Sequence, residues 1–198
     1  RVGRDLCTRP RVIKTHACEA FIDAPRARQR AGLASPLRTV ANGGSAGGLL
    51  MGTIANMAPE CYAGVEADVP FVDALTSILD PSLPLTVTEW DEWGDPLHDA
   101  DVYAYMKSYT PYENAPDSEN DERTTVFPKI FITTSMNDTR VLYVEPMKWL
   151  ARLQHAGVDA VAKIEVEAGH GGTSGRYKQW EEVSYENAWC LSMMGIGS

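Results

Sequence analysis

The 198-residue sequence contains no long apolar run and no regular cysteine pattern. A membrane-spanning helix needs about 18 consecutive apolar residues, so we expect none, and no leading segment is typical of a signal peptide. The cysteines have neither disulfide-type nor metal-ligand spacing, at Cys7, Cys18, Cys61 and Cys190. We therefore expect free thiols in the reducing cytoplasm, with no bound metal and no cofactor.

Positive charge is also scarce, because 18 Lys and Arg stand against 27 Asp and Glu and give a formal net charge of −9. This charge argues against a nucleic-acid partner and favours a cationic one, such as a short basic peptide. Residues 1–31 reverse the balance, since basic side chains outnumber acidic ones there. We predict an irregular basic segment in which Pro25 interrupts any helix. One hypothesis for its origin is a shifted reading frame, a gene remnant or a non-native start. The alternative is a basic tail that binds nucleic acid or an acidic surface.

A glycine-rich run from Asn42 to Gly48 is the most informative part of the chain, since it contains the pattern G-x-S-x-G around Ser45. A strand-like run precedes it and an apolar helical pattern follows at 46–57. A strand that turns directly into a helix strains the central residue and presents its hydroxyl. We expect the flanking glycines to avoid Cβ clashes, and the Ala46 N–H to stabilise an oxyanion. The alternative is an ordinary glycine-rich loop before a helix.

Two further polar residues follow predicted strands. Asp138 comes after the β-rich run 128–134, and His170 comes after the alternating run 161–167. The carboxyl ends of strands are where an open α/β sheet presents functional groups. The chain order Ser45, Asp138, His170 is that of α/β-hydrolases.

These motifs make the chain resemble the C-terminal part of the prolyl oligopeptidase family of serine peptidases, most closely its oligopeptidase B branch. The likeness runs from about Gly32 to the end of the sequence. The matching stretches are GSAGGLLMG (44–52), VPFVD (69–73), DPSLPLT (80–86), EWDEWG (89–94), NDTRV (137–141), EPMKW (145–149), GHGG (169–172) and RYKQW (176–180).

The resemblance implies that residues 32–198 form the C-terminal part of an α/β-hydrolase domain, a mostly parallel sheet flanked by helices. It implies Ser45 as nucleophile, His170 as general base and acid, and Asp138 as the residue that orients the imidazole. The chemistry agrees, because a serine hydroxyl needs an adjacent base and the pKa of histidine suits both proton transfers.

We predict strands near 38–42, 62–66, 129–134 and 161–167, and helices near 46–57, 144–156 and 176–194. In the family, a β-propeller, the first strands of the sheet and a tyrosine oxyanion donor lie upstream. With 44 residues before Ser45, we expect none of them in this sequence. One sheet edge should then be open and apolar, and association with a partner could cover it. We also expect Trp180, Val183 and Leu191 to pack on the sheet as core.

The resemblance also implies a substrate preference. In the oligopeptidase B branch, two carboxylates bind the Arg or Lys side chain that precedes the scissile bond. Glu89 matches the first, and Asp91 stands where the branch usually has glutamate. We expect both acids on one side of an extended segment, with neighbouring tryptophans covering the aliphatic stem; the alternative is a solvated acidic loop. Arg140 matches an arginine that contacts a substrate carbonyl, and its alternative role is an ion pair with a nearby acid.

Three functions are compatible with these features. The first is a serine endopeptidase that hydrolyses short peptides after Arg or Lys through an acyl-enzyme. The second is a non-catalytic remnant that is unstable or depends on a partner. The third is an esterase, or a peptidase of another specificity, with the same fold.

Overall fold

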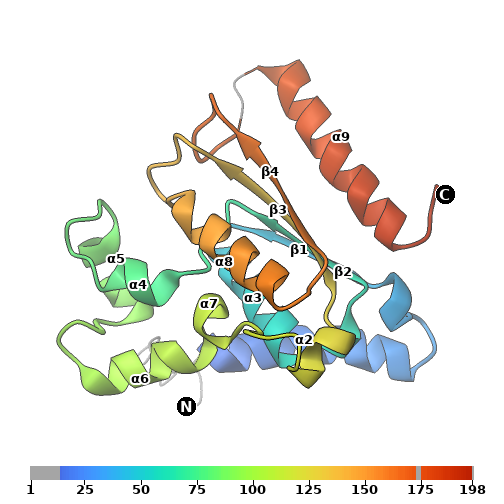
Figure 1. Ribbon diagram of the computed structural model, residues 1–198, viewed down its shortest axis with the longest axis horizontal. Helices are drawn as coiled ribbons and strands as arrows, with labels where there is room; N and C mark the ends of the chain where they lie inside the picture. The colour runs from blue at the N-terminus through green and yellow to red at the C-terminus, as the bar shows by residue number, and fades with distance from the viewer. Residues whose placement is uncertain (1–13, 173–174, 198) are drawn as a thin grey trace, which may run out of the picture.

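The computed structural model describes residues 14–172 and 175–197, so the expectations for residues 1–13, including Cys7, lie outside the described residues. A four-stranded, fully parallel sheet forms the centre (Figure 1), with strand order β1-β2-β3-β4. The strands are β1 (Val40–Gly44), β2 (Gly64–Asp68), β3 (Lys129–Ser135) and β4 (Ala160–Glu165). The four predicted strands are therefore confirmed, with shifts of one or two residues at most ends.

Helices connect these strands, as a parallel sheet requires. Helix α3 (Ala46–Met57) follows β1, α8 (Val144–His155) follows β3, and α9 (Arg176–Met193) follows β4, as predicted. Between β2 and β3 the chain adds smaller helices that the sequence pattern did not predict. They are α4 (Ala74–Ile78), α5 (Thr86–Trp93), α6 (Ala100–Tyr109) and α7 (Pro111–Asn114). Short 3₁₀ turns occur at Pro36–Arg38, Pro59–Cys61 and Glu122–Thr125. None of the helices in the described ranges has the length and apolarity that crossing a bilayer requires.

One face of the sheet carries the main core. Alternate strand residues point to this face, where they meet α3, α8 and the N-terminal helix α2 (Lys14–Arg30). Val65, Ile130 and Ile132 lie there against Ile54 and Trp149, and all five are almost fully buried. A second cluster around Phe71, Trp93 and Met106 joins α4, α5 and α6, which lie on the far side of the molecule from α9 in Figure 1.

The other face of the sheet meets only α9 among the described elements. Phe131 points to this face, with ring centroids 5.7 Å from Tyr185 and 5.4 Å from Trp189. The prediction that Trp180, Val183 and Leu191 are core is wrong, since they are 57%, 50% and 44% exposed. Trp180 precedes Trp189 by two and a half helical turns, so the two side chains leave opposite sides of the helix. The outer side of α9 is therefore apolar and exposed.

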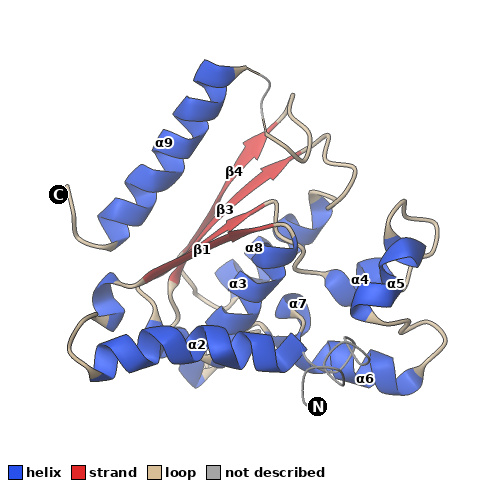
Figure 2. Ribbon diagram, turned by 180° about the vertical axis from the view of Figure 1, so that it is seen from behind, coloured by secondary structure: helices blue, strands red, loops and turns tan. Residues whose placement is uncertain are grey.

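The N-terminal helix α2 (Lys14–Arg30) corrects another prediction, because it runs through Pro25 without interruption. Figure 2 shows it as one continuous helix below the sheet. A proline inside a helix removes a hydrogen bond and crowds the preceding turn. Here the helix is retained by packing, since Cys18 and Ile22 are buried in the main core.

Long polar side chains continue the packed side of α2 beyond Pro25. Arg26 forms an ion pair with Glu60 at 2.7 Å, and the Gln29 side chain donates a hydrogen bond to the Cys61 carbonyl at 2.9 Å. The contacts are polar, so the apolar pattern in the sequence did not show them. The division of the chain at residue 31 stays a prediction.

Candidate active site

The turn between β1 and α3 holds Ser45 in an unusual backbone conformation, with φ 55° and ψ −120°. A positive φ is costly for a residue with a side chain and persists only where the surroundings enforce it. Here the Ser45 amide donates to the Asp68 carbonyl at 2.8 Å, while its own carbonyl accepts from Gly48 at 2.9 Å and Phe71 at 3.1 Å. The turn thus has the strained strand-to-helix geometry predicted for this motif, and the role of Ser45 as nucleophile stays a prediction.

The glycines of the turn differ in their need to lack a side chain. A Cβ at Gly44 would lie 3.2 Å from the Asp68 carbonyl oxygen, and one at Gly48 would lie 2.5 Å from Pro70. At Gly47, a Cβ would have no described atom within 4 Å. The expectation of a clash is therefore correct for Gly48 and wrong for Gly47, whose outer side is open, while a Cβ at Gly44 would make a tight contact short of a clash.

A continuous hydrogen-bond chain links the three predicted catalytic residues. Ser45 Oγ lies 3.1 Å from His170 Nε2, and His170 Nδ1 lies 2.7 Å from Asp138 Oδ2. The other oxygen of Asp138 accepts backbone N–H bonds from Arg140 at 2.8 Å and Val141 at 3.0 Å. Asp138 is 3% exposed, so its carboxylate is buried, and these three contacts orient it toward the imidazole.

The loops that carry Asp138 and His170 are also tied to each other. Both follow neighbouring parallel strands, β3 and β4. Beyond the strands, the Ser135 hydroxyl donates to the Ala168 carbonyl, and the Asn137 amide donates to the Val166 carbonyl at 2.9 Å. These cross-loop bonds hold the acid and the base in register.

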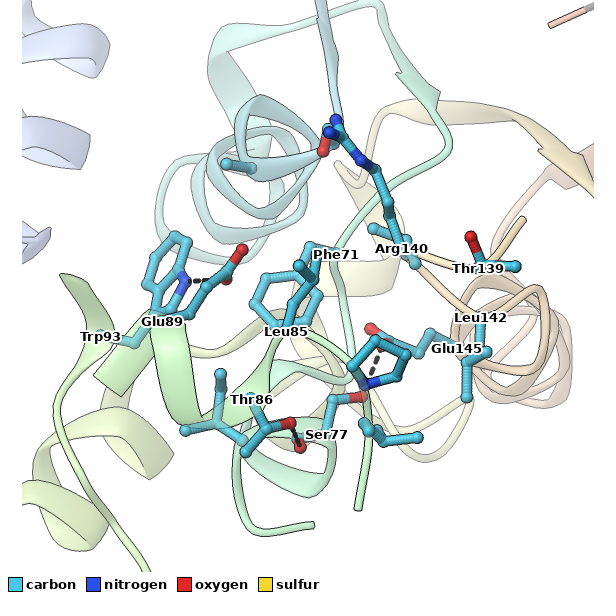
Figure 3. Close-up of a pocket in the computed structure, with 16 residues that line it drawn as sticks. Phe71, Ser77, Leu85, Thr86, Glu89, Trp93, Thr139, Arg140, Leu142 and Glu145 are labelled. Atoms are coloured by element: carbon cyan, nitrogen blue, oxygen red, sulfur yellow. Dashed lines mark hydrogen bonds between the residues drawn. The ribbon is translucent and has the colours of Figure 1, made fainter. Parts of the chain in front are cut away.

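A cavity of about 220 Å³ opens beside the serine. Ser45 and Ala46 line it. Glu89 and Arg140, which Figure 3 labels, also line it. Ala46 is the first residue of α3, where backbone N–H groups have no acceptor within the helix. Its amide therefore lies at the positive end of a helix dipole, next to Ser45 in the chain.

The comparison with known proteins identifies the family of this chain. A model of the prolyl oligopeptidase family matches residues 11–197. The chain belongs to the prolyl oligopeptidase family. The match begins upstream of Gly32, where the predicted likeness starts, so it includes the helix α2.

Relatives within the family share both sequence and structure with the chain. It is 47% identical over 165 residues to Protease 2 of Moraxella lacunata, covering 82% of this chain and 23% of that one. It is 41% identical over 181 residues to Dipeptidyl aminopeptidase BI of Pseudoxanthomonas mexicana, covering 90% and 24%. Oligopeptidase B from Leishmania major superposes with a TM-score of 0.85 at 36% identity, over 93% of this chain and 25% of that one. The chain has the fold of the α/β-hydrolase domain of oligopeptidase B and spans about a quarter of these proteins' length.

The two acids predicted to bind substrate are separated by the structure. The extended segment expected at Glu89 and Asp91 is wrong, because these residues lie within the helix α5. Two positions along a helix turn the side chain by about 200°, so only Glu89 lines the cavity, while Asp91 is exposed and outside the lining. The helix forms because Trp90 and Trp93 must both reach the core. Trp90 donates to the Ile78 carbonyl at 3.1 Å.

Glu89 and Arg140 have distinct settings in the cavity. The Trp93 N–H donates to Glu89 Oε2 at 2.7 Å, and the ring centroid of Trp93 lies 5.6 Å from that of Phe71. Arg140 is exposed and its side chain forms no ion pair within the described residues, so its alternative structural role has no partner there. The catalytic and binding roles of the site residues stay predictions from this family's motif.

Sequence reasoning missed several residues of the cavity, chiefly Glu145, Ser77 and Phe71. Burial raises the pKa of the Glu145 carboxyl to about 7. The only sequence signal for Glu145 was its place in the family-like stretch EPMKW. An acid in the first turn of a helix is commonly explained by the helix dipole, so it gave no indication of a pocket.

Proposed function

We propose that this chain is the catalytic part of a serine endopeptidase that hydrolyses short peptides after Arg or Lys. The observation that carries the proposal is the hydrogen-bond chain from Ser45 through His170 to Asp138, which opens onto a cavity lined by Glu89.

In the first half of the reaction, Ser45 Oγ attacks the scissile carbonyl carbon while His170 Nε2 takes its proton. The Ala46 N–H stabilises the oxyanion. The peptide C–N bond then breaks, the imidazolium gives its proton to the leaving amine, and an acyl-enzyme remains. In the second half, His170 removes a proton from water, the hydroxide attacks the ester, and the proton returns to Ser45. Asp138 keeps the imidazole in the required tautomer throughout.

Specificity for a basic side chain is supported by the charge and shape of the cavity. Glu89 retains acceptor positions beside its bond to Trp93, and a charge-assisted bond to a guanidinium or ammonium is stronger than a neutral one. Arg140 suits a substrate backbone carbonyl. Asp91 contributes at most from outside the cavity, so its assignment as a second binding acid remains the weaker part of the proposal.

Two alternatives remain in the proposal. The 41% identity to a dipeptidyl aminopeptidase favours a peptidase of another specificity, while simple ester hydrolysis is a further outcome of the test. The outer edge of β1 pairs with no strand in the part of the chain that the structure describes, which favours a chain that acts only when a partner covers that edge. The free cysteines of the described residues support a cytoplasmic location, and the acidic charge supports short basic peptides rather than nucleic acid as partners.

The test is hydrolysis of a fluorogenic peptide ending in Arg-Arg by the purified chain and by Ser45→Ala. We expect turnover that the substitution abolishes, and little turnover of a matched peptide with a neutral residue before the scissile bond. Equal turnover of simple esters and all peptides would favour the esterase. A folded chain without Ser45-dependent turnover of any substrate would contradict the proposal and favour the partner-dependent remnant.

A further inference from the structure

The cavity beside Ser45 contains a second buried carboxyl group. Glu145 lies in the first turn of α8 and is 2% exposed. It and Glu89 are the acids among the residues that line the cavity. Figure 3 shows Glu89 and Glu145 on either side of Phe71. The two acids thus reach the cavity from two different helices, α5 and α8.

Neutral donors hold the Glu145 carboxyl in place. The Ser77 hydroxyl donates to Oε1 at 2.5 Å, and the Asp73 backbone N–H donates to Oε2 at 3.0 Å. Each carboxylate oxygen can accept a further bond. Lys148 is one turn further along α8 and is paired with Asp73. Glu145 is thus a buried acid with no cation of its own within the described residues.

A buried charge without a partner is costly, whereas a cation placed against it would remove that cost. The rest of the cavity suits a long cationic side chain. Phe71, Leu85 and Trp93 line it with apolar surface, against which an aliphatic stem can pack while its charged head goes further.

We propose that Glu145 is a specificity-determining residue, which together with Glu89 receives the guanidinium or ammonium group of the side chain preceding the scissile bond. The inference deepens the proposed function and rests on it. In this inference the two substrate-binding acids are Glu89 and Glu145 instead of Glu89 and Asp91, because Glu145 lines the cavity and Asp91 does not.

The position of Glu145 makes recognition of the cation depend on pH. Burial raises its pKa to about 7, with Asp73 adding to the rise and Ser77, the Asp73 amide and Lys148 opposing it. Below about pH 7 the carboxyl is neutral, so a cationic side chain should bind less tightly there than above it. The other charged side chains that line the cavity are Glu89 and Arg140. The binding of a neutral ligand of the same shape should not weaken below about pH 7.

Binding to the Ser45→Ala chain tests the inference without requiring turnover. Calorimetry compares acetyl-arginine amide with acetyl-citrulline amide, a neutral isostere, at pH of about 6 and about 8, on either side of the Glu145 pKa of about 7. We expect the preference for arginine to rise with pH. Glu145→Gln should weaken arginine binding roughly tenfold at the higher pH, leave citrulline binding unchanged and abolish the rise.

Glu113→Gln is the matched control. Burial also raises the pKa of Glu113, and its carboxyl accepts a bond from the Thr110 hydroxyl at 2.6 Å, but it does not line the cavity. This variant should bind both ligands as the parent does.

Several outcomes would overturn the inference. They are an unchanged arginine preference in a folded Glu145→Gln variant, equal loss of both ligands, or no binding of the arginine amide to the folded parent. If Glu145→Gln fails to fold, the test uses the parent alone, through the ratio of its affinities for the arginine and citrulline ligands. If that ratio does not rise with pH, the proposed role of Glu145 is contradicted. Failure of the proposed function would appear separately, as the absence of Ser45-dependent hydrolysis.

Discussion

Asp138 accepts hydrogen bonds on both carboxylate oxygens, one from His170 and the other from two backbone amides. This arrangement leaves the carboxylate no other orientation. In the proposed mechanism, this geometry keeps a proton on Nδ1 of the imidazole and leaves Nε2 to accept the proton of Ser45. The role proposed for Asp138 is therefore to fix the tautomer without contacting the substrate.

Asp138→Asn should test this role. The amide keeps the shape of the side chain, but its NH₂ group can donate to Nδ1 and so favour the tautomer with the proton on Nε2. We expect kcat to fall roughly 10⁴-fold, as measured by steady-state hydrolysis of an arginyl peptide. Affinity for acetyl-arginine amide should be unchanged in the same variant. A loss of less than about tenfold in kcat would contradict the assigned role.

At the scale of elements, the elbow depends on how closely α3 approaches the turn after β2. Gly48 lies in the first turn of α3, where a Cβ would be 2.5 Å from Pro70. The neighbouring Val69 has a positive φ of 37°, so this turn has little freedom to move away. The close contact fixes the start of the helix and hence the position of Ser45.

Gly48→Ala should therefore destabilise the fold by about 1–3 kcal/mol through overpacking, as measured by denaturant unfolding. Gly47→Ala is the matched control on the same helix turn, because its Cβ meets no described atom within 4 Å. That variant should be neutral or more stable by up to about 1 kcal/mol, since alanine favours helix over glycine. Equal effects of the two substitutions would show that the Pro70 contact does not limit the turn.

At the scale of the whole molecule, the sheet contains a buried acid and is covered by helices on both faces. Glu66 on β2 is 0% exposed, and one of its oxygens has no hydrogen-bond partner. Burial raises its pKa to about 8, with Glu186 on α9 and Asp68 adding to the rise and Asn42 opposing it. Glu66 on the sheet and Glu186 on α9 thus lie close enough to raise the pKa of Glu66.

This predicts a pH dependence of stability. Between the ordinary value of 4.5 and about 8, the folded state holds a proton on Glu66 that the unfolded state has released. Stability should therefore fall as pH rises through this range, by at most about 1.4 kcal/mol per pH unit for one group. Glu66→Gln should reduce the slope by up to that amount in denaturant unfolding from about pH 5 to about pH 8. Glu145, Glu113 and Glu186 also have raised pKa values, so some slope should remain. Identical slopes in both proteins would contradict the prediction.

Two exposed surfaces, the outer edge of β1 and the outer side of α9, could be covered by a partner. The outer edge of β1 has no strand partner among the described residues, as predicted. The prediction that this edge is apolar is wrong, because three of its five residues are asparagine or glycine and Asn42 is exposed. The exposed apolar side chains gather instead on α9, including Trp180 and Tyr177. A partner would therefore have to cover both an edge and a helix surface.

The sequence alone determined the features whose physics is local. The elbow is encoded by glycines next to Ser45, and the strand-end places of Asp138 and His170 follow from short apolar runs. Because parallel strands end at a common edge, these positions predict that the three side chains meet, which the structure shows. The four strands and the helices α3, α8 and α9 were predictable for the same reason.

Only the tertiary structure decided what depends on distant partners. Pro25 lies within a helix because Cys18, Ile22 and residues near 60 hold it there. Glu89 and Asp91 diverge because two tryptophans draw their segment into a helix. Glu145 reaches the cavity because α8 packs against the turn after β2, about 70 residues earlier in the chain. Such contacts arise from packing between elements, and no pattern of neighbouring residues contains them.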